Sequence, residues 1–382
     1  MKLYETLIKI GINLSAEKDL ERLLNLILES ACRICKADAG TFYLKNDNFL
    51  EFKVSRNFTL EKKLGKKLLE LVSPHVLPIS NKSIAGWSAE IKEIINIKDL
   101  SSLKNVPYSH NTEFEEKTGY KCKSMLTVPI LDRENSLVGV FQLINKTKGN
   151  KITYFTRTDE KIAHSLSSQA AVAIRSAQLT EELKAAHLET IYLLGEAAEY
   201  KNKETGDHIK RVASFTKVIA ENLGLDKDVV EIIYKGSPLH DIGKIGIPDK
   251  ILTKPGKLKK EEWEIMKQHT TFGFNLLKNS TSNIIKTAAE IAYTHHERWD
   301  GKGYPRGLKG KEIPISGRIV ALSDFFDALT SKRSYRKKPF SFEETLSIIK
   351  KEREKHFCPE TTEAFFKGIK KIKEISKNSL IS

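Results

Sequence analysis

The sequence has few cysteines and no long apolar run. Its 382 residues include only four cysteines, too few and too scattered for a disulfide framework. No stretch approaches the roughly 18 uninterrupted apolar residues that span a bilayer. Residues 1–30 carry acidic residues in an amphipathic pattern, not the apolar block of a signal peptide. We therefore expect a cytoplasmic protein without membrane insertion.

Two of the cysteines, Cys32 and Cys35, have the C-x-x-C spacing that zinc and redox sites use. They lie in ERLLNLILESACRICKADAG, where apolar residues recur at helical spacing. No second Cys/His pair follows nearby, so the pattern favours buried packing residues.

The net charge is strongly positive. Lys and Arg number 64 and Asp and Glu 49, which gives +15 and would suit an anionic partner. The lysines are spread along the chain, and the sequence contains no helix-turn-helix, zinc-finger or aromatic-plus-basic RNA motif. We interpret the charge as a solvated surface and expect no nucleic-acid polymer as a partner.

The length fits two domains and a connector. A leading helix over residues 1–20 and a second over 20–36 precede TFYLKNDNFLEFKVS, which predicts two strands around Asn46-Asp47-Asn48. SMLTVPIL and SLVGVFQLIN form another such pair around residues 132–135. This is an α+β pattern with an antiparallel sheet.

The second half is predicted to be helical. Residues 158–201 have only Gly195 as a break and read as a long connecting helix, which is typical of a parallel dimer seam. Helices separated by short Gly/Pro loops are then expected over residues 207–223, 227–235, 260–277, 284–296, 315–329 and 342–355. The predicted domains are 1–165, a linking helix 166–200 and 201–382.

Histidines and acidic residues gather in this half. Six of the ten histidines follow residue 201: His208, His240, His269, His295, His296 and His356. Glu204 and His208 are four apart and share a helix face. His240 and Asp241, like His295 and His296, are neighbours that would point about 100° apart on a helix.

Any one of these histidines alone is better explained as a hydrogen-bonded core residue, but five together indicate one site. Imidazole and carboxylate groups suit first-row transition metals, and a carboxylate such as Asp241 can bridge two of them. A bridged metal pair polarises a phosphoryl oxygen and supplies a nucleophile at neutral pH. The pattern therefore predicts phosphodiester hydrolysis.

Several segments resemble successive signatures of the HD-GYP family, a branch of the HD metal-dependent phosphohydrolases. They are ETGDHIKRVA, LHDIGKIGIPDKIL, WEIMKQHTTFGFNLL, HHERWDGKGYP and RIVALSDFFDALTSKRSYR, and the resemblance covers roughly residues 196–370. It implies an all-α HD fold with two or three transition-metal ions, iron first and manganese second. It also implies hydrolysis of cyclic di-GMP to pGpG, GMP or both.

The resemblance also implies roles for single residues. The metal ligands it implies are Glu204, His208, His240, Asp241, His269, His295, His296 and Asp324. Asp241 is the expected bridge, and Glu204 is associated in part of the family with a third metal. Lys244 is expected to meet the phosphate or the attacked oxygen.

The substrate-binding residues are expected in two places. Gly301, Gly303, Tyr304 and Pro305 form a loop whose backbone can approach a ligand, with a tyrosine ring to lie against guanine. Arg333 and Arg336 resemble the family's phosphate- and guanine-binding arginines. The chain departs from the family at Phe357-Cys358-Pro359, where an acidic residue usually precedes the proline, and only local helix capping is put in doubt.

Residues from about 15 to 175 resemble a GAF domain. The resemblance rests on NKSIAGW, SMLTVPI and the run Asn145-Lys146 … Phe155-x-x-x-Asp159-Glu160. It implies a structural ion pair between Lys146 and Asp159. The residues leave open whether this domain binds any ligand, because a fold does not define a function.

Three functions remain open from sequence. The first is a cyclic di-GMP phosphodiesterase modulated by the GAF domain. The second is an HD-type hydrolase of another cyclic or linear nucleotide, and the third is an inactive signalling scaffold. The intact histidine–aspartate set, the GYP loop and both arginines favour the first, with cyclic di-GMP as the partner molecule and a homodimer as the assembly.

Overall fold

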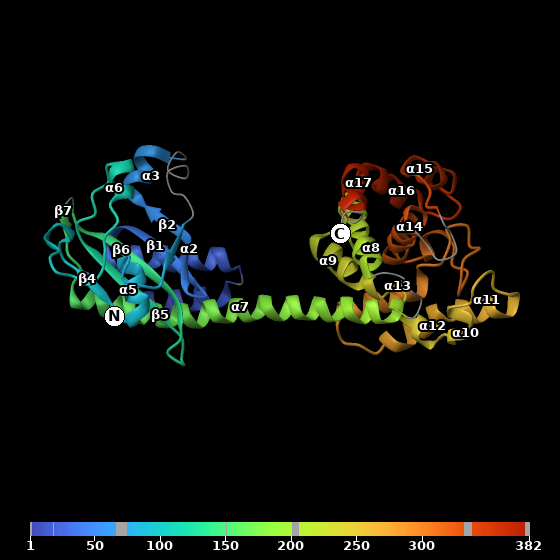
Figure 1. Cartoon of the computed structure of the whole chain (residues 1–382), viewed down its shortest axis with the longest axis horizontal. Coiled ribbons are helices and arrows are strands. Elements are labelled where there is room, and N and C mark those ends of the chain that lie inside the picture. The colour runs from blue at the N-terminus through green and yellow to red at the C-terminus, as the bar shows by residue number, and fades with distance from the viewer. Residues whose placement is uncertain are drawn as a thin grey trace. The chain divides into compact units, whose positions relative to one another are not determined.

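The computed structural model describes residues 2–17, 19–65, 75–149, 151–200, 206–331 and 338–378. The chain divides into two compact units between Leu183 and Lys184. Helix α7 (Arg157–Tyr200) runs through this division as one element. Figure 1 shows a sheet with helices in the first unit and helices in the second.

The first unit is built on an antiparallel sheet. Its strand order is β3-β2-β1-β6-β5-β4, with β7 paired to β6. The strands are β1 (Ala37–Asn46), β2 (Phe49–Asn57), β3 (Val76–Pro78), β4 (Ile95–Ile97), β5 (Met125–Leu131), β6 (Leu137–Lys148) and β7 (Lys151–Thr153). The two strand pairs expected from sequence are the β1–β2 and β5–β6 pairs.

Helices accompany the sheet. They are α1 (Lys2–Ala16), α2 (Leu20–Cys35), α3 (Phe58–Leu64), α5 (Ile84–Ile91), η2 (Leu100–Ser102) and α6 (Glu113–Thr118). Helix α2 begins where Asp19 accepts a hydrogen bond from the Arg22 amide at 2.8 Å, and it ends at Lys36, which adopts a left-handed conformation. The α+β prediction is therefore confirmed.

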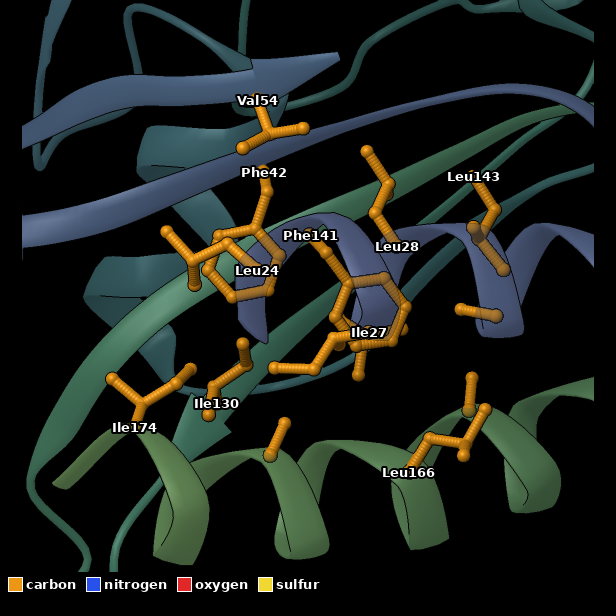
Figure 2. Close-up of a cluster of buried hydrophobic side chains, with 14 of the residues drawn as sticks. Leu24, Ile27, Leu28, Phe42, Val54, Ile130, Phe141, Leu143, Leu166 and Ile174 are labelled. Carbon is orange, nitrogen blue, oxygen red and sulfur yellow. The ribbon is translucent and has the colours of Figure 1, made fainter. Parts of the chain in front are cut away.

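The core of this unit lies between one face of the sheet and helices α2 and α7. Figure 2 shows Leu24, Ile27 and Leu28 of α2 meeting strand side chains and Leu166 and Ile174 of α7. Cys32 and Cys35 are fully buried in the same cluster as free thiols. Their predicted packing role is confirmed.

The opposite face of the sheet lines a cavity of about 530 Å³. Thr41, Tyr43 and Gln142 face it, whereas their neighbours Phe42 and Phe141 face the core, as the two-residue period of a strand requires. Beside the sheet, the ammonium group of Lys146 donates to the Asp159 carboxylate, so the expected ion pair is present.

The second unit is helical. Its helices are α8 (Gly206–Asn222), α9 (Lys227–Gly236), η3 (Ser237–Leu239), η4 (Ile242–Gly246), α10 (Asp249–Leu252), α11 (Lys260–Lys267), α12 (His269–Leu277), α13 (Asn283–Thr294), η5 (Gly310–Glu312), α14 (Ile315–Thr330), α15 (Phe342–Lys351), α16 (Pro359–Lys367) and α17 (Ile369–Asn378). Val212, Phe215 and Ile219 of α8 pack against Ile319 and Phe326 of α14 in its core. Among the described residues, no helix is both long and apolar enough to cross a membrane.

Three helix predictions are wrong in detail. Residues 260–277 form two helices separated at Gln268, and the break lets the His269 imidazole donate to the Met266 carbonyl at 2.8 Å. Helix α13 ends at Thr294, two residues earlier than expected, and α15 ends at Lys351, four residues earlier. Helices α3, α5, α6, α10, α16 and α17 were not predicted.

Candidate metal centre

Two groups of histidine and aspartate side chains adjoin in the second unit. One contains Asp241, His269, His295 and His296, and the other contains His208, His240 and Asp324. Within each group, the candidate ligand atoms lie within 4.8 Å of one another. The groups meet where Nε2 of His240 lies 3.3 Å from Oδ2 of Asp241 and 3.9 Å from Oδ1 of Asp324.

Five separate segments carry these side chains. His208 lies in α8, Asp324 lies in α14, and His269 is the first residue of α12. His240 and Asp241 lie between two short 3-10 helices, and His295 and His296 directly follow α13. The expectation that these two pairs lie within helices is wrong. Both pairs occupy helix ends, where the backbone turns and lets neighbouring side chains converge.

The rings are held by their outer nitrogens. Nδ1 of His240 donates to the Ser237 carbonyl at 2.9 Å, and Nδ1 of His295 donates to the Ile291 carbonyl at 3.0 Å. His269 makes the equivalent bond to Met266. A ring whose Nδ1 donates a proton in this way keeps the lone pair of Nε2 free, which is the usual arrangement of a metal-bound histidine.

The inward-facing atoms lack protein partners. Nε2 of His240, His269 and His295 and Oδ1 of Asp241 are buried, and none has a hydrogen-bond partner within the described part of the chain. Oδ1 of Asp241 lies 3.2 Å from Nε2 of His269 and 3.5 Å from Nε2 of His295. Buried polar atoms without partners are costly. Their convergence fits cations bound between them.

The carboxylates of the site favour positive charge between them. Burial alone would lower the pKa of His240, but the Asp241 and Asp324 carboxylates outweigh it and raise that pKa to about 9. Burial, together with the charges of His295 and His269, holds the pKa of His296 well below its usual value. His296 is therefore neutral, which is the form that binds metals.

His208 is oriented by a buried carboxylate that sequence reasoning missed. Its Nδ1 lies 2.7 Å from Oδ2 of Asp327, and Nε2 lies 3.5 Å from Asp324. Arg211 also donates to Asp327 through Nε and a terminal nitrogen. The signal was present in the sequence, since Asp327 follows Asp324, and Arg211 follows His208, by three residues on one helix face.

Lys244 lies beside the Asp241 carboxylate. Its ammonium nitrogen lies 2.7 Å from Oδ2 of Asp241 and 3.0 Å from Oε1 of Glu199, in the last turn of α7. Burial raises the pKa of Asp241, yet Lys244 and His240 overcome it and hold that pKa well below the usual range. Asp241 is therefore ionised. Glu199 was not predicted as part of this site.

The glycine–tyrosine–proline loop lies against the histidines. The Tyr304 ring stacks on His296 with centroids 4.8 Å apart, and the Trp263 ring meets Tyr304 edge-on at 6.1 Å. A Cβ at Gly303 would come within 2.4 Å of the Arg298 amide nitrogen, so only glycine permits this approach.

Glu297, the third residue of the HHE motif, was also missed as a functional residue. Its carboxylate accepts hydrogen bonds from the amides of Arg306 at 2.8 Å and Leu308 at 2.9 Å, which fixes the end of the loop.

A further expectation concerned helix capping at Cys358. The Cys358 side chain makes no capping hydrogen bond at the start of α16.

Three predicted site residues lie outside the described part of the chain. They are Glu204, Arg333 and Arg336. Of the others, the structure brings together the seven histidine and aspartate side chains and Lys244, with Tyr304 beside them. Gly303 and Pro305 belong to the same loop as Tyr304.

Comparison with known families agrees with this arrangement. Residues 192–361 match the HD domain family, and residues 19–174 match the GAF domain family. The second unit is therefore a domain of the HD class. More particularly, the chain carries a GAF domain followed by an HD domain, as the sequence motifs led us to expect.

Several relatives of known name are similar to about half of the chain. A cyclic di-GMP phosphodiesterase of Thermotoga maritima is 52% identical over 49% of this chain and 50% of its own length. The 3'3'-cGAMP-specific phosphodiesterase 2 of Vibrio cholerae is 42% identical over 54% of this chain and 39% of its own. The cyclic di-GMP phosphodiesterase response regulator RpfG of Xanthomonas campestris is 41% identical over 51% of each. The chain thus spans about half the length of these relatives or less.

Proposed function

We propose that this protein hydrolyses cyclic di-GMP at a metal centre in its HD domain. The observation that carries the proposal is the convergence of three unpartnered imidazole Nε2 atoms on the Asp241 carboxylate. The names of the Thermotoga and Xanthomonas relatives support cyclic di-GMP as the substrate. This function requires water to attack phosphorus and the P–O bond to the ribose to break.

The metal ligands we propose are His208, His240, Asp241, His269, His295, His296 and Asp324. Glu204 would complete a third position, which gives two or three metal ions. Iron is the first choice and manganese the second, since imidazole and carboxylate ligands suit both. Such ions supply Lewis-acid polarisation of the phosphodiester and a water molecule that is nucleophilic at neutral pH.

The remaining site residues would handle the substrate. Lys244 would stabilise negative charge on the phosphoryl group, because its ammonium nitrogen already lies at the shared carboxylate. Gly303, Tyr304 and Pro305 would form one side of the guanine site. Arg333 and Arg336 would bind the phosphate and guanine. The products would be pGpG, GMP or both.

A second cyclic dinucleotide is the alternative substrate. The Vibrio cholerae relative at 42% identity is named as specific for 3'3'-cGAMP. The nucleotide 3'3'-cGAMP differs from cyclic di-GMP in one base. The choice between the two substrates therefore depends on base recognition, and the metal chemistry would be the same.

The GAF domain would modulate the activity through helix α7, and the protein would act as a homodimer in the cytoplasm. The GAF cavity of about 530 Å³ has room for a small ligand whose identity stays open. Continuity of α7 from the first unit into the second supports a mechanical link. The cytoplasmic location remains a prediction from sequence.

Competition between two substrates tests the proposal. The full chain is purified anaerobically, its metal content is measured, and cyclic di-GMP and 3'3'-cGAMP are offered separately and together. We expect chelation to abolish turnover, metal addition to restore it, and kcat/KM to be higher for cyclic di-GMP. Preference for 3'3'-cGAMP would select the alternative, and turnover that survives complete metal removal would refute the metal mechanism.

A further inference from the structure

The last turns of α7 pack against the segment that carries His240, Asp241 and Lys244. Ile191 and Ala198 of α7 pack with Leu239 and Ile242 in one buried cluster. At Gly195 the two backbones come so close that a Cβ there would lie 2.5 Å from the Pro238 carbonyl oxygen. The connecting helix therefore contacts the metal-centre segment directly, through apolar packing and a glycine.

One charged side chain extends from this helix into the site. Glu199 is 1% exposed and accepts a hydrogen bond from the Lys244 ammonium at 3.0 Å. The same ammonium lies 2.7 Å from Asp241. Lys244 is thus held between a carboxylate of the connecting helix and the carboxylate at the middle of the metal centre.

We propose that Glu199 is a positioning residue, which sets where Lys244 stands relative to the reacting phosphate and so couples the connecting helix to catalysis. This inference rests on the proposed phosphodiesterase function and deepens it. Two carboxylates compete for one ammonium group, so Lys244 is shared. Without Glu199, Lys244 would lose one of the two carboxylates that hold it, would lie closer to Asp241 and would be less available to the phosphoryl oxygen as charge develops there.

The geometry also explains how α7 could transmit a signal. An axial shift or rotation of α7 moves Glu199 with the helix, while Asp241 stays with its own segment. The position of the Lys244 ammonium then depends on its distances to the Glu199 and Asp241 carboxylates. A signal that reaches the end of α7 would therefore act on turnover through Lys244, in addition to any movement of the segment against which α7 packs.

A double-mutant cycle in the full-length chain tests this role. The variants are Glu199→Gln, Lys244→Met and the two together, with Glu196→Gln as a matched control one turn earlier on α7. Glu196 pairs with Lys210 at 3.7 Å and is partly exposed. For each variant, metal content, melting temperature, kcat and KM are measured with cyclic di-GMP and with the generic ester bis(p-nitrophenyl) phosphate.

We expect Glu199→Gln to retain its metal and to lose kcat by about 10- to 100-fold, with KM changed less than about threefold, as for other residues that orient an active group. In the Lys244→Met background, the same substitution should change kcat by less than about twofold, because the group through which it acts is gone. Glu196→Gln should behave like the wild type.

Other outcomes overturn the inference. Equal losses from Glu199→Gln in both backgrounds would mean a structural effect, and a loss no larger than that of Glu196→Gln would mean no role. If the wild type cleaves only the generic ester, the cyclic di-GMP proposal fails, and the Glu199 inference is decided on that ester. A metal-loaded wild type that cleaves neither ester refutes both.

Discussion

At the scale of single residues, the site depends on groups that hold the ligands as much as on the ligands. The His208 ring is oriented by Asp327, which is itself held by Arg211. Burial raises the pKa of Asp327, but hydrogen bonds from His208 and Arg211 outweigh it and hold that pKa far below its usual value. The carboxylate is therefore ionised at every pH where the protein would work.

Substitution of Asp327 by Asn should weaken metal binding. The loss of the charge weakens the hold on the His208 ring and removes the charged partner of the Arg211 guanidinium. The loss of such an outer partner typically costs 10- to 100-fold in metal affinity. Titration of metal-free protein measures the effect, with Asp228→Asn on the surface of α9 as the control. Equal affinities in the two variants would contradict the orienting role.

His356 makes the stability of the second unit depend on pH. Burial lowers the pKa of its imidazole to about 4, and the nearby Arg298 acts in the same direction. Since an unfolded histidine titrates near 6.5, the unfolded chain binds the extra proton first on acidification. The free energy of unfolding therefore has its full value above about pH 6.5 and falls as the pH drops towards 4. The preference of the folded state for the neutral imidazole accounts for about 3 kcal/mol of this loss.

Urea unfolding at several pH values between 7 and 4.5 measures this dependence. The variant His356→Gln should show a shallower loss of stability over the window than the wild type, whatever its stability at pH 7. An identical slope in the two proteins would show that His356 does not cause the loss.

At the scale of elements, the helices and strands with strong periodicity were predictable and the helix ends were not. The β1–β2 and β5–β6 pairs and helix α7 follow from alternating and helical apolar patterns. The helix break at Gln268, where the His269 ring bonds to the Met266 carbonyl, is a local feature that no periodicity encodes. The same holds for His240 and His295, whose placement at helix ends depends on tertiary packing.

The candidate site was largely visible in the sequence because its residue types are unusual at those spacings. Its supporting residues were harder to predict: the spacing of Asp327 from Asp324 was a weak signal, and a buried Glu199 has the same letter as an exposed one. Glu199 belongs to the predicted linking helix, and only the fold reveals that this helix reaches Lys244.

Gly195 provides a test of how closely α7 must approach the metal-centre segment. In an exposed helix, Gly→Ala stabilises by about 0.5 to 1 kcal/mol. Here the added Cβ would meet the Pro238 carbonyl oxygen at 2.5 Å, backbone that cannot move without shifting His240. We therefore expect Gly195→Ala to lower kcat at least tenfold while circular dichroism stays unchanged. Activity equal to that of the exposed control Ala197→Ser would contradict this.

At the scale of the whole molecule, α7 has an apolar face that the described residues leave exposed. Val172, Leu179, Leu193 and Tyr200 recur at intervals of seven or fourteen residues and are about half or more exposed, and Leu183 is 71% exposed. A seven-residue apolar repeat is the pattern of a two-stranded coiled coil. A second copy of the same helix would cover it.

The double substitution Leu179→Lys and Leu193→Lys should therefore convert a dimer into a monomer. Light scattering with size-exclusion chromatography at micromolar concentration measures the mass, and Ala185→Lys, on an exposed position between them, is the control. A wild-type chain that is already monomeric would remove the dimer proposal. It would leave the metal centre unaffected.

The central claim is that Asp241 joins the two histidine groups into one hydrolytic metal centre, and the turnover of Asp241→Ala tests it most directly. Removal of the carboxylate leaves three buried Nε2 atoms without their shared anion. We predict that cyclic di-GMP hydrolysis falls by several orders of magnitude and metal content falls below that of the wild type, while the variant stays folded by circular dichroism and substrate binding weakens far less. A folded Asp241→Ala protein with near-full turnover would contradict the account.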